Sequence, residues 1–309
     1  MTTPRALLVD PDHALHYHIV SRCVRQSWLC GWDKRQRKDY SHRKLALERR
    51  LFRLTRCFAV ELHGFAIMSN HFHLVLRYDP NACLEWSANE VAERWVAATA
   101  SQPVFGDPHR QQAQIEHLLA DPKNIERLRH RLGSLSAFMQ QLKQPIARGA
   151  NLEDGVTGHF FEQRFYSGAL LSERALVAAM AYVDLNPVRA RIAKDIEQCK
   201  HTSIAKRLEE NSEASLNRAL QPLASGLNAV EDEHSMSMTL GEYIEGLREL
   251  IAAGRGKTEY DDRLVTPRIQ RWAQNVATLA RRQRAFGHIE QLHHWLARHG
   301  MRALETPFA

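Results

Sequence analysis

The sequence predicts an α+β fold in which a central antiparallel sheet is covered by helices. Short stretches with the alternating pattern of strands lie at about residues 15–24, 58–67, 71–77 and 159–171. Amphipathic stretches with the period of helices separate and follow them. The resulting order is strand, helix, two strands, helix, strand, helix, which is typical of α+β proteins with the helices packed on the sheet.

The first half of this pattern begins with the strand at 15–24, followed by a loop and a basic helix at 41–56. On that helix, one face carries Leu47, Leu51 and Leu54, and another carries Arg49, Arg53 and Arg56. The stretches 58–67 and 71–77 flank a Ser69-Asn70 turn, so we expect them to form a hairpin.

The second half begins with helices at 86–100 and 111–120, after which Asp121-Pro122 opens a long basic helix to about residue 150. The short strand at 159–171 comes next. Ser172 then starts a helix that Pro187 limits near its end.

A change in composition divides the chain. We expect residues 1–205 to form one domain, with a helical insertion at about 81–125. Residues 206–238 are polar and loosely patterned, which is typical of a linker. Residues 239–309 contain three helical stretches, at 239–253, 266–286 and 288–299, and are predicted to form a helical C-terminal extension without catalytic residues.

Composition limits the possible classes of protein. The chain has 309 residues, of which 44% are hydrophobic and 25% charged, as in ordinary globular proteins. The longest uncharged apolar run, residues 175–183, is too short to cross a membrane, and the first residues lack a signal-peptide pattern. Five cysteines without a C-x-x-C pair argue against a disulfide framework or a thiolate zinc site. We therefore expect a cytoplasmic protein.

The charge distribution indicates a polyanionic partner. The 42 basic and 35 acidic residues give a formal charge of +7. Between Lys34 and Arg56, ten Lys or Arg residues face only two acids, Asp39 and Glu48. A solvated basic face is the plainer interpretation of one such helix. The density of charge nevertheless favours phosphate contacts.

Two H-x-H pairs are candidates for metal ligation. They are His16 with His18 on the first strand, and His71 with His73 on the third. Because strand side chains alternate, each pair points to one face of its strand. Phe72, Leu74 and Leu76 would anchor the opposite face of the third strand in the core, which favours His71 and His73 as a preorganised pair. A pair without a metal role is the alternative for either one.

The helix that ends at Pro187 carries a second candidate. Tyr182 and Asn186 are four residues apart and so project from one side of it. A tyrosine is a poor nucleophile at neutral pH unless a cation stabilises the developing charge. Two imidazoles and an amide oxygen could hold such a cation. The alternative is a buried tyrosine beside an asparagine that caps the helix.

Three motifs in this order carry a resemblance: GFAIMSNHFHLVLR, GHFFEQRFYSGAL and AYVDLNPVRA. Together with YHIVSRCVRQ near the start, they resemble the REP-associated tyrosine transposases, a branch of the single-tyrosine HUH endonucleases and transposases. The resemblance spans about residues 15–204. The longer segment at 81–125 and the helical tail depart from the compact mobile members, which leaves transposition itself open.

The resemblance implies a ferredoxin- or RRM-like HUH sheet and a set of roles. It makes Tyr182 the nucleophile and His71, His73 and Asn186 the ligands of a divalent metal, Mg²⁺ or Mn²⁺, whereas His16 and His18 become structural. The expected activity is cleavage and rejoining of single-stranded or hairpin DNA through a 5′-phosphotyrosine, in a protein associated with the nucleoid. Between a monomer and a dimer, a monomer is favoured. For phosphate contacts we expect six basic residues: Arg49, Arg53, Arg56, Arg127, Arg131 and Lys143.

Three alternatives to this activity remain at the level of the sequence. A catalytically silent DNA-binding protein would keep the basic helix and need no metal. A domesticated factor acting on chromosomal repeats would keep both and never mobilise itself. A metallohydrolase would need further acidic or histidine ligands at strand ends, and the sequence shows no such pattern.

Overall fold

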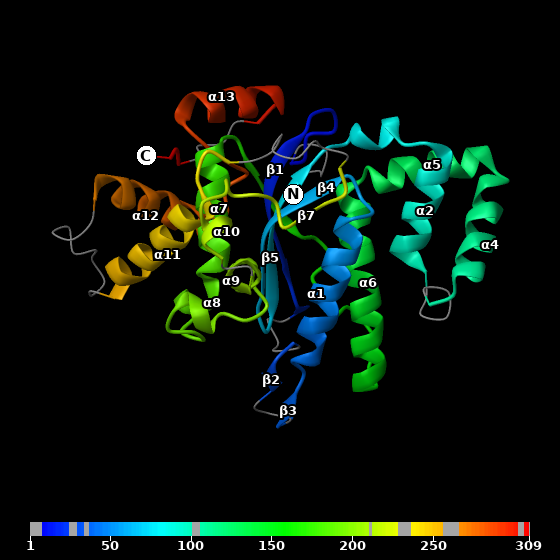
Figure 1. Cartoon of the computed structure of the whole chain (residues 1–309), viewed down its shortest axis with the longest axis horizontal. Coiled ribbons are helices and arrows are strands. Elements are labelled where there is room, and N and C mark those ends of the chain that lie inside the picture. The colour runs from blue at the N-terminus through cyan, green and yellow to red at the C-terminus, as the bar shows by residue number, and fades with distance from the viewer. Residues whose placement is uncertain are drawn as a thin grey trace.

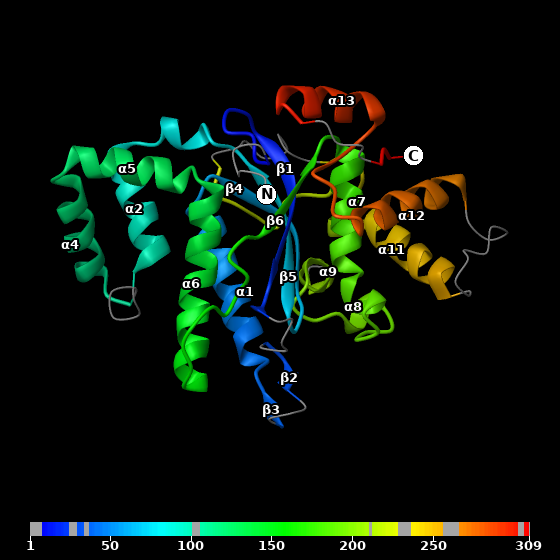
Figure 2. The ribbon, with the colours of Figure 1, turned by 180° about the vertical axis from the view of Figure 1, so that it is seen from behind.

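The computed structural model describes residues 8–24, 30–33, 37–100, 106–209, 212–227, 236–255, 266–301 and 306–308. Within them a six-stranded sheet runs through the middle of the molecule, with helices on both faces (Figures 1 and 2). The predicted α+β class is therefore confirmed.

The sheet has the strand order β7-β4-β5-β1-β6-β8. Its four central strands are β4 (Val60–Ile67), β5 (His71–Tyr78), β1 (Leu15–Arg22) and β6 (Tyr166–Leu170). These are antiparallel to their neighbours, as predicted. The short edge strands are β7 (Ala224–Ser225) and β8 (Ala285–Phe286), and β8 runs parallel to β6. The whole sheet is therefore mixed, although its centre is antiparallel.

The predicted hairpin forms, and its register decides which residues share a face. In the pairing of β1 with β5, Arg22 lies opposite His71 and Val20 opposite His73. Alternation then sends His18, His71 and His73 to one face, while Phe72 and Leu74 point to the other.

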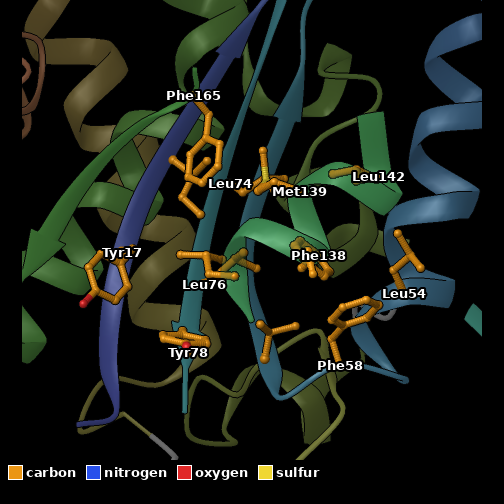
Figure 3. Packing of buried hydrophobic residues seen from close by; sticks show 14 of the residues in the cluster. Tyr17, Leu54, Phe58, Leu74, Leu76, Tyr78, Phe138, Met139, Leu142 and Phe165 are labelled. Carbon is orange, nitrogen blue, oxygen red and sulfur yellow. The ribbon is translucent and has the colours of Figure 1, made fainter. Parts of the chain in front are cut away.

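Helices α1 (His42–Thr55) and α6 (Leu135–Asp154) cover the second of these faces. Leu47, Leu51 and Leu54 of α1 are almost completely buried there, as the helical period predicts. Figure 3 shows this core, where Leu54 of α1 lies beside Phe58, and Phe138 of α6 lies between them and Leu76 of β5 in this view. At the far end of the two helices, Arg43 bridges them through Glu153 and Asp154.

Helix α7 (Glu173–Asp184) covers the other face, and its apolar residues are buried on all sides. Against its outer side pack α11 (Leu240–Arg255) and α12 (Pro267–Leu279), which belong to the C-terminal extension (Figure 1). The remaining short helices on this side are α8 (Asn186–Arg189), η4 (Ile196–Gln198), α9 (Ser203–Glu209) and α10 (Glu213–Leu216).

The segment after β5 is helical, as expected, and lies at one end of the molecule beyond α6 (Figure 1). It comprises η3 (Ala82–Glu85), α2 (Ala88–Thr99), α4 (Pro108–Leu119) and α5 (Pro122–Leu132). The single long helix predicted for 122–150 is wrong, because the chain breaks at Gly133 into α5 and α6. A Cβ at Gly133 would stand 2.5 Å from Cys83 Sγ, and Ser134 caps α6 through the Ala137 amide. Close packing on η3 and a new N-cap thus interrupt the helix.

The C-terminal extension contains the three predicted helices, α11, α12 and α13 (Ile289–Arg298). Residues 285–286, expected at the end of a helix, instead form β8 beside β6. Residues 224–225 of the expected linker form β7 beside β4. The expected linker and the C-terminal extension therefore each add one edge strand to the central sheet. The division of the chain into a domain, a linker and an extension stays a prediction.

The described residues include no helix with both the length and the apolar character needed to cross a membrane. All five cysteines are buried, and none of them forms a disulfide bond.

The remaining short sheet pairs β2 (Trp32–Asp33) with β3 (Lys38–Asp39) ahead of α1.

Candidate active site

Strand β5 brings His71 and His73 to the sheet face covered by α7. Their ring centroids are 4.9 Å apart. His73 is buried, with 4% of its surface exposed, whereas His71 is half-buried at the start of the strand. The pair therefore lies at the end of β5 next to the Ser69-Asn70 turn, with one ring open to the surface and one enclosed.

Helix α7 brings Tyr182 to the same place. Ser172 caps the helix by accepting a hydrogen bond from the Ala175 amide, and the last turn closes at Leu185. Pro187 has no N–H to continue the ladder, so a separate short helix, α8, begins at Asn186. Tyr182 and Asn186 still lie about one turn apart and both face β5.

The four residues predicted for the site come together. The ring centroids of His73 and Tyr182 are 5.7 Å apart, and Asn186 Nδ2 lies 3.2 Å from His73 Nε2. The structure therefore places these four side chains together where β5 meets the end of α7.

His18 is a fifth member, which the sequence did not assign to the site. Its Nε2 lies 3.0 Å from His73 Nδ1, and the two rings stack with centroids 5.2 Å apart. Its ring also contacts Tyr182, at 5.5 Å. His16, two residues earlier on the same strand face, packs instead against His63, at 5.0 Å. Of the first H-x-H pair, one ring therefore supports the site and the other does not.

The hydrogen bonds assign protons to the imidazoles. His71 Nδ1 lies 2.6 Å from Asn70 Oδ1, an acceptor, so Nδ1 carries the proton and Nε2 keeps its lone pair. Asn186 Nδ2 is a donor, so His73 Nε2 also holds a lone pair. The proton of His73 then sits on Nδ1 and is donated to His18 Nε2. Both members of the H-x-H pair thus present an unprotonated Nε2.

Burial keeps these rings neutral. Loss of hydration lowers the pKa of His71 to about 4 and that of His18 to about 3, and it holds the pKa of His73 well below its usual value. The positive charge of Arg22, opposite His71, acts in the same direction on His71 and His73. Neutral imidazoles with unprotonated Nε2 atoms, next to an amide that also carries an oxygen, fit a divalent cation, which would take the place of the Asn186 Nδ2 donor at His73 Nε2.

Two further side chains set the surroundings of Tyr182. The guanidinium of Arg189 lies 4.6 Å from the centre of the Tyr182 ring, a cation–π distance. Tyr166, the other tyrosine near the histidines, donates its hydroxyl to the carbonyl of Gln283. No hydrogen bond involving the Tyr182 hydroxyl occurs among the described residues, so this phenol is the available one.

A buried carboxylate fixes the end of α7. Asp184 accepts hydrogen bonds from Ser203 Oγ, from the Ile204 amide at 2.8 Å and from Tyr243 Oη at 2.7 Å. Burial raises its pKa, and its partners and Arg207 oppose that shift. Because Asp184 lies between Tyr182 and Asn186, these bonds to α9 and α11 hold both site residues in place.

The six basic residues predicted to contact phosphate lie away from this group. Arg49 and Arg56 are exposed on α1, on the opposite side of the sheet from α7. Arg53 is half-buried and donates to the Ala98 carbonyl of α2, at 3.1 Å.

Of the others, Arg127 is exposed on α5 and bonded to Asn124, whereas Arg131 lies near the Trp95 ring, at 5.3 Å. Lys143 of α6 donates to the Glu162 carbonyl, at 2.9 Å. It lines a groove of about 620 Å³ between α6 and residues 158–165, which lead into β6. Lys143 is therefore the member of the set that contacts the segment leading into β6.

Another cluster with metal-ligand chemistry lies outside the site. Asp10, Asp12 and His13 offer ligand atoms within 4.8 Å of one another. Asp10 Oδ1, however, already accepts from the amides of Asp12 and His13. These hydrogen bonds hold residues 10–13 in a turn, and the turn explains why the three side chains lie close together.

No protein-family model and no curated protein matches the chain. Among solved structures, the chain is similar to one described as a REP-associated tyrosine transposase bound to a REP hairpin. The alignment has a TM-score of 0.40 and 12% identity, and covers 77% of this chain and 97% of that chain. The family named there is the one that the sequence motifs resemble.

Proposed function

We propose that the protein is a metal-dependent endonuclease and strand transferase that cuts single-stranded or hairpin DNA through a 5′-phosphotyrosine. The observation that carries the proposal is the placement of the Tyr182 phenol beside two neutral imidazoles and an amide on one face of the sheet. The same residues occupy the motif positions that resemble the single-tyrosine HUH enzymes.

His71, His73 and Asn186 would hold the cation, Mg²⁺ or Mn²⁺. When bound, such an ion polarises the scissile phosphate and stabilises the charge that develops on it. Neighbouring side chains of the protein orient the two imidazoles. Asn70 and His18 fix the protons of the two histidines on Nδ1, which keeps both Nε2 atoms directed away from these partners.

Tyr182 is the nucleophile in this proposal. Its Oη forms a bond to phosphorus while the bond from phosphorus to the 3′ oxygen breaks. The phenol loses a proton and the departing 3′ oxygen gains one, so the products are a 5′-phosphotyrosine and a free 3′-hydroxyl. Arg189 lies at the Tyr182 ring, where its charge can attract the phosphate to the phenol.

The step is reversible because one phosphodiester replaces another. A second 3′-hydroxyl can attack the phosphotyrosine and rejoin the strands without ATP. The half-buried positions of His71, Tyr182 and Asn186 suit a strand whose bases are unpaired, since a phosphate must reach all three at once.

A labelled hairpin oligonucleotide with a single-stranded flank, incubated with the full chain and Mn²⁺, tests the proposal. We expect a covalent protein–DNA band on a denaturing gel. Tyr182→Phe should bind the oligonucleotide with unchanged affinity and lose the band, because only the attacking oxygen is removed. Tyr166→Phe is the matched control, since its hydroxyl is bonded to Gln283.

Peptide mapping of the trapped adduct locates the nucleophile. A modified peptide containing Tyr166, or cleavage without any adduct, would overturn the mechanism. Binding without cleavage by the wild-type protein in Mn²⁺ or Mg²⁺ would instead identify a catalytically silent DNA-binding protein. His71→Ala, His73→Ala and Asn186→Ala should each reduce cleavage and metal dependence together, with Asn186→Ala the mildest.

A further inference from the structure

A cavity lies at the other end of α7 from Tyr182, in a part of the chain that the predicted site does not use. It has a volume of about 570 Å³. Its walls come from the first residues of α7, the inner face of α12, residues 237–238 and the N-cap of α13. The residues that matter for its chemistry are Arg174, Arg268, Arg271, Trp272, Asn275 and His288.

Helix α12 supplies most of the polar side chains through its period. Arg268, Arg271, Trp272 and Asn275 stand at positions i, i+3, i+4 and i+7, so they share the face that lines the cavity. Both arginines lie in the first two turns, near the positive end of the helix dipole. Cations there are unfavourable for the helix alone, and a bound anion would reverse that penalty.

Carboxylates of the described residues do not pair with the arginines of the cavity. Among the described residues, none of Arg174, Arg268 and Arg271 forms an ion pair within 4.0 Å. The positive charge of Arg268 does contribute to lowering the pKa of Glu242. The carboxylate that lines the cavity, Glu173, is engaged by the amide and hydroxyl of Ser237, at 2.8 and 2.5 Å. The guanidinium of Arg174 instead lies 3.4 Å from His288 Nε2.

A buried donor in the same wall has no partner. Trp272 is 9% exposed, and its Nε1 makes no hydrogen bond among the described residues. The benzene edge of the indole packs on Gly246 of α11, where a Cβ would come 2.0 Å from Cζ3. Nε1 lies on the opposite edge of the ring from Gly246, in a residue that lines the cavity. Because an indole N–H can only donate, its complement is an acceptor such as a phosphate oxygen.

We propose that this cavity binds a nucleotide through its phosphate group. Arginine guanidinium groups match the geometry of phosphate oxygens, and the N-terminus of α7 adds amides with a favourable dipole. The volume suits a whole small ligand and exceeds what a lone ion requires. Ten residues of helix separate Ser172 from Tyr182, about 15 Å along the axis, so the two sites are distinct.

The nucleotide has two possible sources with the same chemistry, a free nucleotide or one residue of a bound DNA strand. Isothermal titration of the full chain with deoxythymidine 5′-monophosphate, and separately with thymidine, measures the contribution of the phosphate. We expect binding of the monophosphate and at least a tenfold weaker affinity for thymidine. Arg268→Gln/Arg271→Gln should weaken monophosphate binding at least tenfold, and Trp272→Phe should weaken it less.

Arg110→Gln/Lys123→Gln is the matched control, because it removes the same charge from α4 and α5 at the other end of the molecule (Figure 1). Its affinity for the monophosphate should equal that of the wild type. Equal affinity in the Arg268→Gln/Arg271→Gln variant, or no monophosphate binding by the wild type, would overturn the proposal. Thermal unfolding of each variant establishes that the fold is retained.

Competition then separates the two sources. If saturating monophosphate displaces a labelled (dT)12 strand from the Tyr182→Phe protein, the cavity holds part of a DNA strand. If strand affinity is unchanged, the ligand is a free nucleotide. Both results concern binding, so the nucleotide site and the Tyr182 chemistry can fail independently of each other.

Discussion

The two ring nitrogens of His73 face different neighbours, and this difference decides what the residue can do. Nδ1 faces His18 and Nε2 faces Asn186. With the proton held on Nδ1, the ring is neutral and oriented before any ligand arrives. His18 therefore serves as a positioning residue, because it fixes the tautomer and the angle of a ring that would bind the metal.

We predict that His18→Ala weakens the binding of Mn²⁺ by about 10- to 100-fold, in line with the loss of other outer partners of metal ligands. Electron paramagnetic resonance of free Mn²⁺ in a titration measures this without any cleavage assay. His16→Ala is the control, because His16 lies on the same face of β1 but packs on His63. An unchanged Mn²⁺ affinity in His18→Ala would show that His73 does not need this partner.

The individual site residues show what the sequence could and could not predict. The period of a strand was enough to place His71 and His73 on one face, and the period of a helix to place Tyr182 beside Asn186. The role of His18 depends on register, since only the pairing of β1 with β5 puts its ring next to His73 rather than elsewhere on the face. Register between distant strands is set by the whole sheet and was not visible in either strand alone.

At the scale of the element, α7 depends on helices that come much later in the chain. Asp184, in its last turn, joins it to α9 through Ser203 and to α11 through Tyr243. A buried carboxylate needs each of these donors, because water cannot replace a missing one.

We expect Tyr243→Phe to lower the free energy of unfolding by about 1–3 kcal/mol, the usual cost of leaving a buried charged group short of a hydrogen bond. Chemical denaturation monitored by circular dichroism measures it. A double-mutant cycle with Asp184→Ala supplies the control, and the two effects should be strongly non-additive because both remove the same bond. Additive effects would mean that the hydroxyl and the carboxylate stabilise the protein separately.

Helix α1 is the element whose charge first suggested a DNA partner. Its apolar face is buried as predicted, but its arginines differ from one another. Arg49 and Arg56 are exposed, whereas Arg53 holds α2 through Ala98. The sequence pattern could not separate these roles, because the packing of α2 on this side of α1 is a tertiary contact.

We predict that Arg49→Gln/Arg56→Gln reduces the slope of log K against log salt for single-stranded DNA by about 0.7 for each phosphate that the variant no longer neutralises. Fluorescence anisotropy at several salt concentrations measures the slope. Arg53→Gln should lower the thermal stability instead, since it removes the bond to α2. If the slope of the double variant equals that of the wild type, the exposed face of α1 is simply solvated.

At the scale of the whole molecule, the C-terminal extension is part of the architecture that holds the site. It provides β8 at one edge of the sheet and packs α11 and α12 against α7, and the expected linker before it provides β7 at the other edge. The change in composition after residue 205 predicts a linker and an extension, and that division stays a prediction. It could not predict that two-residue strands within them would pair with the sheet, because such short strands carry no periodicity of their own.

The last prediction concerns a chain truncated after residue 209. Removing the rest exposes the outer side of α7, whose residues Leu176, Val183 and Met180 are now buried in a core shared with Tyr243 and other residues of the extension. It also uncovers the edges of β4 and β6, which then offer unpaired backbone groups to other chains. We therefore expect the truncated protein to aggregate or to bind a hydrophobic dye strongly, and to lose DNA cleavage together with its cooperative unfolding transition.

Size-exclusion chromatography and thermal unfolding measure this, with a chain that ends after Met301 as the control, because it retains every strand and helix described above. A monomeric 1–209 chain that unfolds at the temperature of the full protein would show that the catalytic face needs no support from the extension.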